Sequence, residues 1–273
     1  MQHILGLVRR CVEDYHMIEP GDRIAVGVSG GKDSLLTLVS LARLQKFYPI
    51  PFAVEAITME MGMPGMDFSG VAALCEKLEV PYTRIQVPVY QIIFEERKEK
   101  NPCSLCAKLR RGSLHTALTE RGIHKIALGH HYDDVIETIL MGMLWGAQVQ
   151  TMMPKLHSTN FPGMELIRPL YLIREDDIKA WRDYNGLHFI QCACKFTDSC
   201  TTCRGEGNQE TRSKRAEVKE LIRTMKKTNP DVEQHIFRSV ENVCLDTVIA
   251  YKQGGKKISF LDGYDGDNPS VTP

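Results

Sequence analysis

The feature that most constrains the fold is a glycine turn between an apolar segment and a helical segment near residue 30. Residues 23–28 form an apolar run typical of a buried strand, and residues 35–42 have the composition of a helix. The turn between them is Ser29-Gly30-Gly31-Lys32-Asp33-Ser34. A strand, a glycine turn and a helix in this order direct backbone N–H groups and the positive helix end at an anion. The sequence therefore predicts a phosphate-binding loop.

The side chains of this loop indicate which kind of phosphate-binding loop it is. Gly30 and Gly31 let the backbone approach a phosphate closely, Ser29 and Ser34 add hydroxyl groups, and Lys32 adds a positive charge. Neither the Walker spacing nor the dinucleotide G-x-G-x-x-G spacing fits these residues. The six residues resemble the signature of the PP-loop ATP pyrophosphatases, which split ATP between the α- and β-phosphates to adenylate a substrate. The alternative is an ordinary strand-to-helix turn.

Strand and helix segments alternate through the first half of the chain. We expect strands at 23–28, 51–58, 82–87, 125–128 and 165–169, separated by helices in the first four intervals. This alternation predicts an α/β fold with a parallel sheet that is covered by helices on both faces. Ligands of such sheets bind at the carboxyl ends of the strands, where the loops at 29–34, 59–65 and 129–132 converge.

The pattern changes after residue 146. We expect a helix at 175–184, an extended piece at 188–192, and long helices at 210–227 and 231–251. The predicted organisation is an N-terminal helix at 1–22, a PP-loop domain at 23–195, a helical extension at 196–261 and a disordered tail at 262–273. The polar segment 89–101 is either a helix or a lid.

The amino-acid composition limits which cellular compartment and which binding partners we expect. No apolar run among the 273 residues is long enough to span a membrane, and no secretory signal is evident, so we expect a cytoplasmic protein. In a reducing compartment its nine cysteines are expected to bind metal or act in catalysis rather than form disulfides. Lysine plus arginine and aspartate plus glutamate both number 34, so any nucleic-acid site has to be a local patch.

Two groups of cysteines have the spacing of metal ligands. Cys103 and Cys106 form a C-x-x-C pair, and a second group follows almost ninety residues later, comprising Cys192, Cys194, Cys200 and Cys203. Four thiolates suit zinc, whereas an iron–sulfur cluster uses three or four. Three further cysteines lie at apolar positions of expected helices and are predicted to be buried, namely Cys11, Cys75 and Cys244.

A resemblance to a known family covers residues 23–194. The loop at 29–34, the segments Cys103-Ser104-Leu105-Cys106 to Gly112 and Lys125 to Thr138, and the residues at 152–156 and 167–170 resemble the tRNA 2-thiocytidine synthetase family. The resemblance implies an ATP-dependent tRNA thiolase that replaces the C2 oxygen of cytidine by sulfur. It implies a [4Fe–4S] cluster on three cysteines, with the fourth iron open for a sulfur atom, and Mg²⁺ with the ATP.

The resemblance also implies particular ligands and partners. Cys103 and Cys106 match two cluster ligands, and Cys192 matches the third, although Gln191 stands where the family usually has proline. Cys194 is the alternative third ligand. Cys200 and Cys203 depart from the family pattern and belong to an insertion, a second metal site or a pair of solvated thiols. The implied partners are tRNA and a sulfur donor such as a cysteine desulfurase or sulfide, and the implied assembly is a homodimer.

Candidate site residues follow from the same motifs. The candidate catalytic residues are Asp33, Asp133, Asp134 and Arg110. The candidate ATP-binding residues are Ser29, Gly30, Gly31, Lys32, Asp33, Ser34, Gly129 and His130. Capping of a helix is the alternative role for the two consecutive aspartates, and a salt-bridged helix face is the alternative for Arg110 and Arg111.

A basic stripe lies on the expected helix at 210–227. Its members recur every four residues, as Arg215, Lys219, Arg223 and Lys227. The stripe is a candidate contact for the tRNA backbone, and a solvated helix face is the alternative. Two other functions stay open from the residues, namely a PP-loop sulfurtransferase for another tRNA position or a small molecule, and a zinc-stabilised nucleotide-binding module without catalysis.

Overall fold

The computed structural model describes residues 1–62, 65–92, 102–186 and 214–264. Its centre is a six-stranded sheet in the order β3-β2-β1-β4-β6-β5. All neighbouring strands are parallel except β5, which pairs antiparallel with β6 at one edge. The strands are β1 Arg23–Gly27, β2 Ala53–Glu60, β3 Tyr82–Gln86, β4 Lys125–Ala127, β5 Lys155–His157 and β6 Glu165–Ile167. The expected parallel sheet is confirmed, and β5 is an addition that the sequence did not predict.

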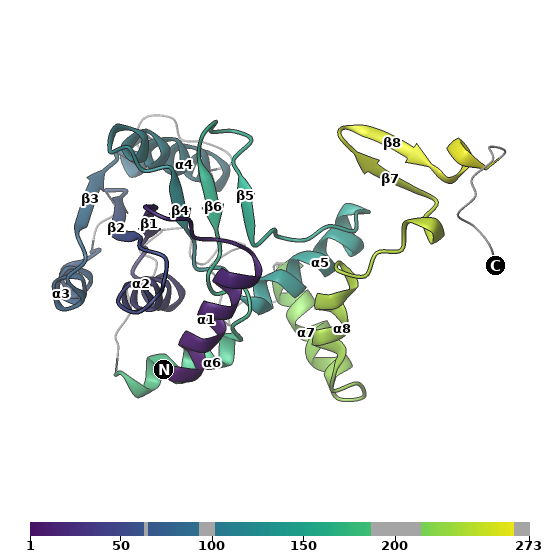
Figure 1. Ribbon diagram of the computed structural model, residues 1–273, viewed down its shortest axis with the longest axis horizontal. Helices are drawn as coiled ribbons and strands as arrows, with labels where there is room; N and C mark the ends of the chain where they lie inside the picture. Colours follow the sequence, from purple (N-terminus) through teal and green to yellow (C-terminus); the bar gives the residue numbers. More distant parts are fainter. Residues whose placement is uncertain (63–64, 93–101, 187–213, 265–273) are drawn as a thin grey trace.

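Helices cover both faces of this sheet, as expected (Figure 1). The helices are α1 Gln2–Asp14, α2 Lys32–Leu44, α3 Ser69–Leu78, α4 Pro102–Glu120, α5 Tyr132–Gly146, α6 Glu175–Tyr184, α7 Lys214–Lys226 and α8 Val232–Ser239. Alternate residues of β1 face opposite layers, because side chains of a strand alternate between its two sides. Ile24 and Val26 join the larger core, whereas Ala25 joins the smaller one with Leu118 of α4.

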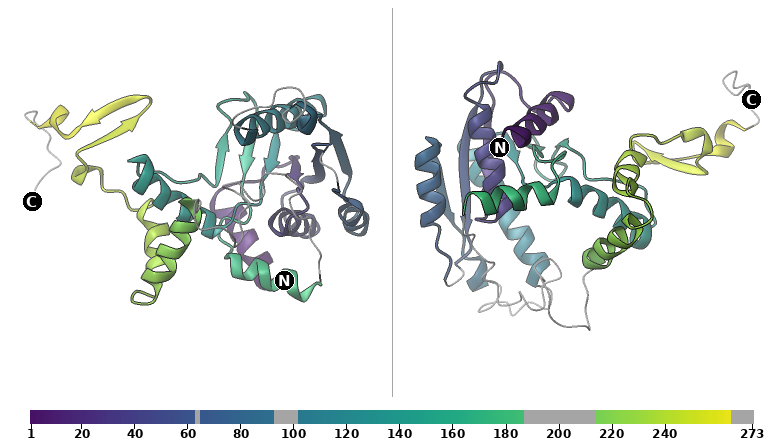
Figure 2. Two further views of the ribbon diagram at one scale, coloured as in Figure 1. Left: turned by 180° about the vertical axis from the view of Figure 1, so that it is seen from behind. Right: turned by 90° about the horizontal axis from the view of Figure 1, so that it is seen from below.

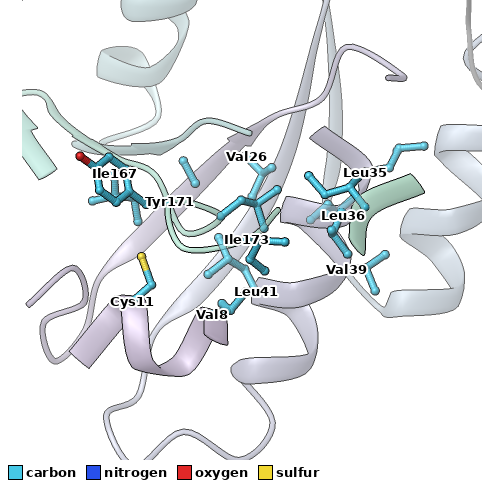
Figure 3. Packing of buried hydrophobic residues seen from close by; sticks show 14 of the residues in the cluster. Val8, Cys11, Val26, Leu35, Leu36, Val39, Leu41, Ile167, Tyr171 and Ile173 are labelled. Atoms are coloured by element: carbon cyan, nitrogen blue, oxygen red, sulfur yellow. The ribbon is translucent and has the colours of Figure 1, made fainter. Parts of the chain in front are cut away.

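The larger core fixes α2 behind the glycine turn. Figure 3 shows Leu36 and Leu41 of α2 among side chains from α1, β1 and β6 and from the segment after β6. Cys11 of α1 is fully buried there, and its thiol donates a hydrogen bond to the carbonyl of Arg168 at 3.6 Å. Burial raises the pKa of Cys11 to about 12, so this thiol stays protonated. The predicted burial of Cys11 and Cys75 is confirmed.

Helix α4 begins earlier than expected. The sequence predicts a helix from Ala107 to about Arg121, after the cysteine pair, but the structure starts it at Pro102, a residue that favours the first helical turn. Cys103 and Cys106 therefore lie in α4 itself, one turn apart. Because α4 follows β3, this first turn lies at the carboxyl edge of the sheet, as the glycine turn after β1 does.

The predicted helix at 231–251 is wrong beyond Ser239. After α8, the chain forms a short 3-10 turn at Leu245–Thr247 and a hairpin of β7 Ala250–Gln253 and β8 Lys256–Ser259. Gly254 and Gly255 have φ of 57° and 77°, the left-handed region that two-residue hairpin turns require. The prediction of a buried helical Cys244 is wrong for the same reason, since Cys244 is exposed after α8.

Several predicted features lie outside the described residues. They are most of the segment at 89–101, the extended piece at 188–192, the cysteines Cys192, Cys194, Cys200 and Cys203, and the tail from residue 265. Within the described part of the chain, no helix is long and apolar enough to cross a membrane.

Candidate functional site

The glycine turn is a closed loop built around Ser34. Its hydroxyl donates to the carbonyl of Gly31 at 2.9 Å and accepts from the amide of Ser29 at 3.2 Å. Gly30 has a φ of 82°, which a residue with a side chain rarely adopts. Gly31 is the N-cap of α2, so the unpaired amides of the first helical turn face the loop. This geometry fits an anion at the start of α2.

Gly129 brings the segment after β4 directly against this loop. A Cβ atom at Gly129 would lie 2.8 Å from the carbonyl carbon of Asp33 and 3.0 Å from the amide nitrogen of Ser34. Real Cβ contacts are almost never that short, so the backbone of α2 leaves no room for a side chain here. Gly129, a candidate ATP-binding residue, thus sets the distance between two loops of the sheet edge.

Lys32 is held between two carboxylates. Its ammonium lies 3.2 Å from both oxygens of Asp33 and 3.4 Å from Oε1 of Glu175 in the first turn of α6. Lys32 donates its hydrogen bond to Oδ2 of Asp33 and not to Oδ1. Asp33 Oδ1 is buried and accepts no hydrogen bond from the residues that the structure describes. The site therefore keeps a carboxylate oxygen that is ion-paired with Lys32 but accepts no hydrogen bond within the described part of the chain, beside the phosphate-binding turn.

Glu175 links this lysine to α7. Its Oε2 lies 3.5 Å from the ammonium of Lys219, and Lys179 approaches it at 3.3 Å. Burial alone would raise the pKa of Glu175, but Lys219, Lys32 and Lys179 outweigh burial and hold the pKa at about 2. Glu175 is therefore fully ionised at neutral pH and bridges the loop of β1 to a helix more than forty residues downstream.

His131 lies at the centre of the site. Its side chain is only 6% exposed, and Nε2 lies 4.0 Å from Asp33 Oδ1 and 3.5 Å from Asp134 Oδ2. Nδ1 is buried without a hydrogen-bond partner among the described residues, although it is 3.7 Å from Asp133. Buried polar atoms are nearly always paired in folded proteins. Two atoms without a hydrogen bond from the described residues lie here, Nδ1 of His131 and Oδ1 of Asp33. They indicate a site that binds a polar ligand.

Asp133 and Asp134 make structural contacts. Asp133 accepts from the amide of Glu175 at 2.7 Å and from Arg174 at 3.1 Å, so it caps the N-terminus of α6. Asp134 accepts from the amide of His131 at 3.1 Å, so it caps its own helix α5, and its Oδ1 lies 2.5 Å from Arg215. The alternative role as helix caps is thus present for both aspartates.

Glu137 is buried one turn further along α5. Its carboxylate is approached by Arg215 at 3.1 Å and by Lys219 at 3.6 Å. Burial raises the pKa of Glu137 to about 7, even though Lys219 and Arg215 act in the opposite direction. Arg215 and Lys219, two members of the predicted basic stripe, therefore point at the carboxylates of α5 and α6. The alternative of a solvated helix face is wrong for these two residues.

His130 differs from its neighbour. Its Nδ1 accepts a hydrogen bond from Nε of Arg168 at 3.3 Å. Burial, with the nearby charge of Arg168, lowers the pKa of His130 to about 4. Because Nδ1 accepts this hydrogen bond, a neutral His130 carries its proton on Nε2, where it can still donate to a ligand.

The cysteine pair lies at the same edge of the sheet. Cys106 is half-buried, forms no disulfide, and its sulfur is 3.9 Å from the sulfur of Met61 in the loop after β2. Only the backbone of Cys103 is described, one turn earlier in α4. Arg110 follows Cys106 by four residues and is exposed, so both lie on one face of the helix. The predicted third ligand, Cys192, lies outside the described residues.

The residues present fit both groups that the sequence implies. Turn amides, Lys32 and the Asp33 oxygen that accepts no hydrogen bond from a described residue suit a nucleotide with its divalent cation. Thiols one turn apart suit a cluster that binds through thiolates. Among the described residues, no three His, Cys, Asp or Glu side chains are placed to hold a metal ion by themselves.

Comparison with known proteins decides the family. Residues 7–199 match the PP-loop domain family. The chain is 36% identical over 238 residues to a tRNA-cytidine(32) 2-sulfurtransferase of Pseudomonas fluorescens, covering 87% of this chain and 82% of that protein. A protein of the same name from Methylobacillus flagellatus is 36% identical over 241 residues, covering 88% of this chain and 75% of that protein. The chain belongs to the PP-loop family of tRNA-cytidine 2-sulfurtransferases.

A solved structure shows that the fold is shared with a wider group of thiolases. The U34-tRNA thiolase NcsA from Methanococcus maripaludis, solved with its [4Fe–4S] cluster, superimposes with a TM-score of 0.65 and 24% identity. The match covers 87% of this chain and 78% of that one. At this identity the likeness establishes the fold of the 2-sulfurtransferase and leaves its individual site residues to the geometry above.

Sequence reasoning missed part of the site of this 2-sulfurtransferase. It did not identify Arg174 and Glu175, which lie beyond the carboxyl end of β6 and contact Asp133 and Lys32. The strand itself was predicted, so its carboxyl end could have directed attention to these residues. It also missed Glu137, whose burial within an apolar helix face no local pattern reveals.

Proposed function

We propose that the chain is an ATP-dependent tRNA sulfurtransferase that adenylates the C2 oxygen of a cytidine and replaces that oxygen with sulfur. The observation that carries the proposal is the convergence, at one edge of the sheet, of the Ser29–Ser34 loop and the first turn of α4 with its two cysteines. Membership of the 2-sulfurtransferase family supports the choice of cytidine.

The loop residues are proposed to bind the ATP phosphates. The hydroxyl groups of Ser29 and Ser34, the amides at Gly30 and Gly31, and the ammonium of Lys32 all face the start of α2. Asp33 Oδ1, which accepts no hydrogen bond from the described residues, is proposed to coordinate Mg²⁺, which binds carboxylate and phosphate oxygens together. These groups stabilise the charge that develops as pyrophosphate leaves and the cytidine C2 oxygen becomes part of AMP.

The cysteines are proposed to hold a [4Fe–4S] cluster through Cys103, Cys106 and Cys192. When bound, the cluster supplies an open iron at which the incoming sulfur atom is carried. Met61 contacts Cys106 and shields its sulfur on one side. Arg110, one turn beyond Cys106, is proposed to meet the phosphate charge of the substrate.

Asp133 and Asp134 are proposed to act in catalysis through His131. They cap α6 and α5, and both carboxylates lie within 4 Å of the imidazole. They therefore fix the position of a buried ring whose Nδ1 is left for the substrate or the nucleotide.

The partners are part of the same proposal. The sulfur atom comes from a donor such as a cysteine desulfurase or sulfide, and we propose a cytoplasmic homodimer, as the resemblance implies. An enzyme that acts on tRNA has to work in a compartment that contains tRNA, which supports the cytoplasm as its location.

Two measurements test the proposed function. Anaerobically purified protein is expected to contain about four iron and four sulfide per chain. Transfer RNA from a deletion strain is expected to lack 2-thiocytidine, and a plasmid copy is expected to restore it. Zinc without iron would favour the nucleotide-binding module instead, and unchanged 2-thiocytidine would exclude cytidine as the target.

A further inference from the structure

The last part of the chain that the structure describes lies apart from the sheet domain (Figure 1). We call residues 243–264 the C-terminal arm. It comprises the turn at Leu245–Thr247, the β7–β8 hairpin and a 3-10 turn at Phe260–Gly263. None of its residues is buried. Figures 1 and 2 show the arm projecting from the side of α5 and α8, far from α2 and α3.

The hairpin carries charge of one sign. Its ten residues include three lysines and no acidic residue, and the lysines are Lys252, Lys256 and Lys257. Lys252 lies directly opposite Lys257 in the strand register. Like charges in opposing positions destabilise a strand pair. Within the described part of the chain, no ion pair is formed by any of the three lysines, so nothing there offsets this repulsion.

The basic residues of α7 are in a different situation. Arg215 and Lys219 contact buried carboxylates of α5 and α6, and Lys226 pairs with Glu233 at 2.5 Å. Arg223 pairs with Glu220. The acidic partners of Arg215, Lys219 and Lys226 are buried or partly buried, and that of Arg223 is exposed. These four basic residues of α7 are therefore neutralised within the chain, whereas the described residues offer the hairpin lysines no acidic partner.

The form of the arm limits which anion fits. A two-stranded hairpin with no layer beneath it is marginally stable in water, so a bound partner is needed to fix it. None of the residues of the arm is buried, so the described part of the arm does not enclose a small anion. Its end carries exposed rings of Phe260 and Tyr264, packed edge to face at 6.1 Å. Lysines beside exposed aromatic rings suit an RNA strand, through phosphate contacts and base stacking.

We propose that the C-terminal arm binds the sugar–phosphate backbone of tRNA through Lys252, Lys256 and Lys257, while another part of the same tRNA occupies the sheet edge. This inference rests on the proposed function, since only an RNA substrate large enough to reach both parts uses such an arm. According to this proposal, the arm binds substrate, and the sheet domain binds ATP and assembles the cluster.

The test replaces the three lysines by glutamine in the full-length, cluster-containing protein. The probe is a fluorescently labelled, unmodified tRNA transcript, titrated at several salt concentrations. The variant is expected to raise the Kd about tenfold near physiological salt and to reduce the slope of log K against log salt by about 2 to 3, because each lost phosphate contact removes roughly one unit. Bound iron and ATP affinity are expected to stay at wild-type values.

A matched control removes the same charge elsewhere. Arg43, Lys46 and Lys77 are exposed on α2, after it and on α3, at the opposite end of the molecule (Figure 1). Their replacement by glutamine is expected to change the tRNA Kd less than twofold. Replacing the three hairpin lysines by arginine keeps the charge and is expected to retain wild-type affinity, which separates charge from folding of the hairpin.

Three results would overturn the proposal. One is an unchanged tRNA Kd and salt slope in the glutamine variant. Another is an equal loss in the control variant, which would show that net charge alone matters. The third is a change from dimer to monomer in sedimentation velocity with unchanged tRNA affinity, which would make the arm a contact between protein chains. A wild-type protein that neither binds nor thiolates tRNA would instead refute the proposed function.

Discussion

At the scale of single residues, Gly129 shows how closely the loops of the site are packed. The atoms nearest to an added Cβ belong to the backbone of Asp33 and Ser34, which cannot rotate away as a side chain can. The start of α2 must therefore shift if residue 129 acquires a side chain. The phosphate-binding turn depends on the position of those same backbone atoms.

We expect Gly129→Ala to destabilise the fold by about 1–3 kcal/mol through overpacking. The variant is also expected to bind ATP at least tenfold more weakly, because the amides of α2 move. Chemical denaturation and equilibrium ATP binding measure the two effects. Gly70→Ala in α3 is the control, since nothing lies within 4 Å of its added Cβ. Wild-type ATP affinity in Gly129→Ala would contradict this account of the site.

Cysteine substitutions separate the cluster ligands from the other thiols. We expect Cys106→Ser and Cys192→Ser to lose most of the bound iron, measured with the visible absorption of the cluster after anaerobic purification. Cys244→Ser is the control, because Cys244 is exposed and distant in sequence from both cysteine groups. If Cys194→Ser loses iron and Cys192→Ser keeps it, the third ligand is Cys194.

At the scale of helices, α5, α6 and α7 are joined by alternating charges. Glu175 bridges Lys32 and Lys219, and Lys219 continues to Glu137, which also binds Arg215. The pKa values of the two carboxyl groups are shifted in opposite directions. The pKa of Glu175 is held at about 2, whereas burial raises that of Glu137 to about 7.

These shifts give opposite pH dependences of stability. Glu175 has a folded pKa below its usual value of 4.5, so its stabilisation is present above pH 4.5 and is lost as the pH falls toward 2. Glu137 has a folded pKa above 4.5, so its carboxyl stabilises most when protonated, and that contribution is lost as the pH rises from 4.5 through 7.

We expect Glu175→Gln to lower the free energy of unfolding by about 2 kcal/mol at pH 7, with a smaller difference below pH 4.5. Glu137→Gln is expected to behave inversely, with a cost relative to wild type that shrinks as the pH rises from 4.5 to 7. Denaturation between pH 2 and pH 8 measures both. Glu220→Gln, which replaces an exposed carboxylate on α7, is the control. Parallel pH curves for Glu137→Gln and wild type would refute the assigned burial effect.

The sequence predicted helices and strands where their pattern is local. The bounds of α6 at 175–184 and the β1–glycine–α2 unit were predicted because apolar spacing and glycine fix them within a few residues. The hairpin at 250–259 was missed because the helix expected at 231–251 was extended into its first strand, which has only four residues. Edge strand β5 has three residues, too few for a pattern.

The contacts of the site were less predictable than its location. The motifs correctly directed attention to the loops at Ser29 and Gly129. That Arg215 and Lys219 turn inward depends on Glu137 and Glu175 lying opposite them. Glu137 is 78 positions from Arg215 in the sequence, and Glu175 is 44 positions from Lys219. Only tertiary packing decides whether such a lysine is solvated or paired.

At the scale of the whole molecule, the stabilising core ends before the C-terminal arm begins. The last buried side chain is Phe237 of α8, which stacks on Tyr132 of α5 with ring centroids 4.4 Å apart. Every described residue after Phe237 is at least partly exposed. Apolar burial supplies most of the stability of a domain, so the arm adds little to it.

We therefore expect a chain that ends at Asn242 to fold, with a free energy of unfolding within about 1 kcal/mol of the full-length value, since surface changes away from the core have small effects. The truncated protein is expected to keep its iron and its affinity for ATP, because the loop, α4 and α6 are intact. Thiolation of tRNA is expected to fall through a higher KM for tRNA, with a smaller change in kcat.

A truncation at Asn229, which removes α8 and exposes Tyr132, is the control that should unfold. Loss of iron or of the unfolding transition in the chain ending at Asn242 would show that the arm stabilises the sheet domain, and an unchanged KM for tRNA would show that substrate is bound without it.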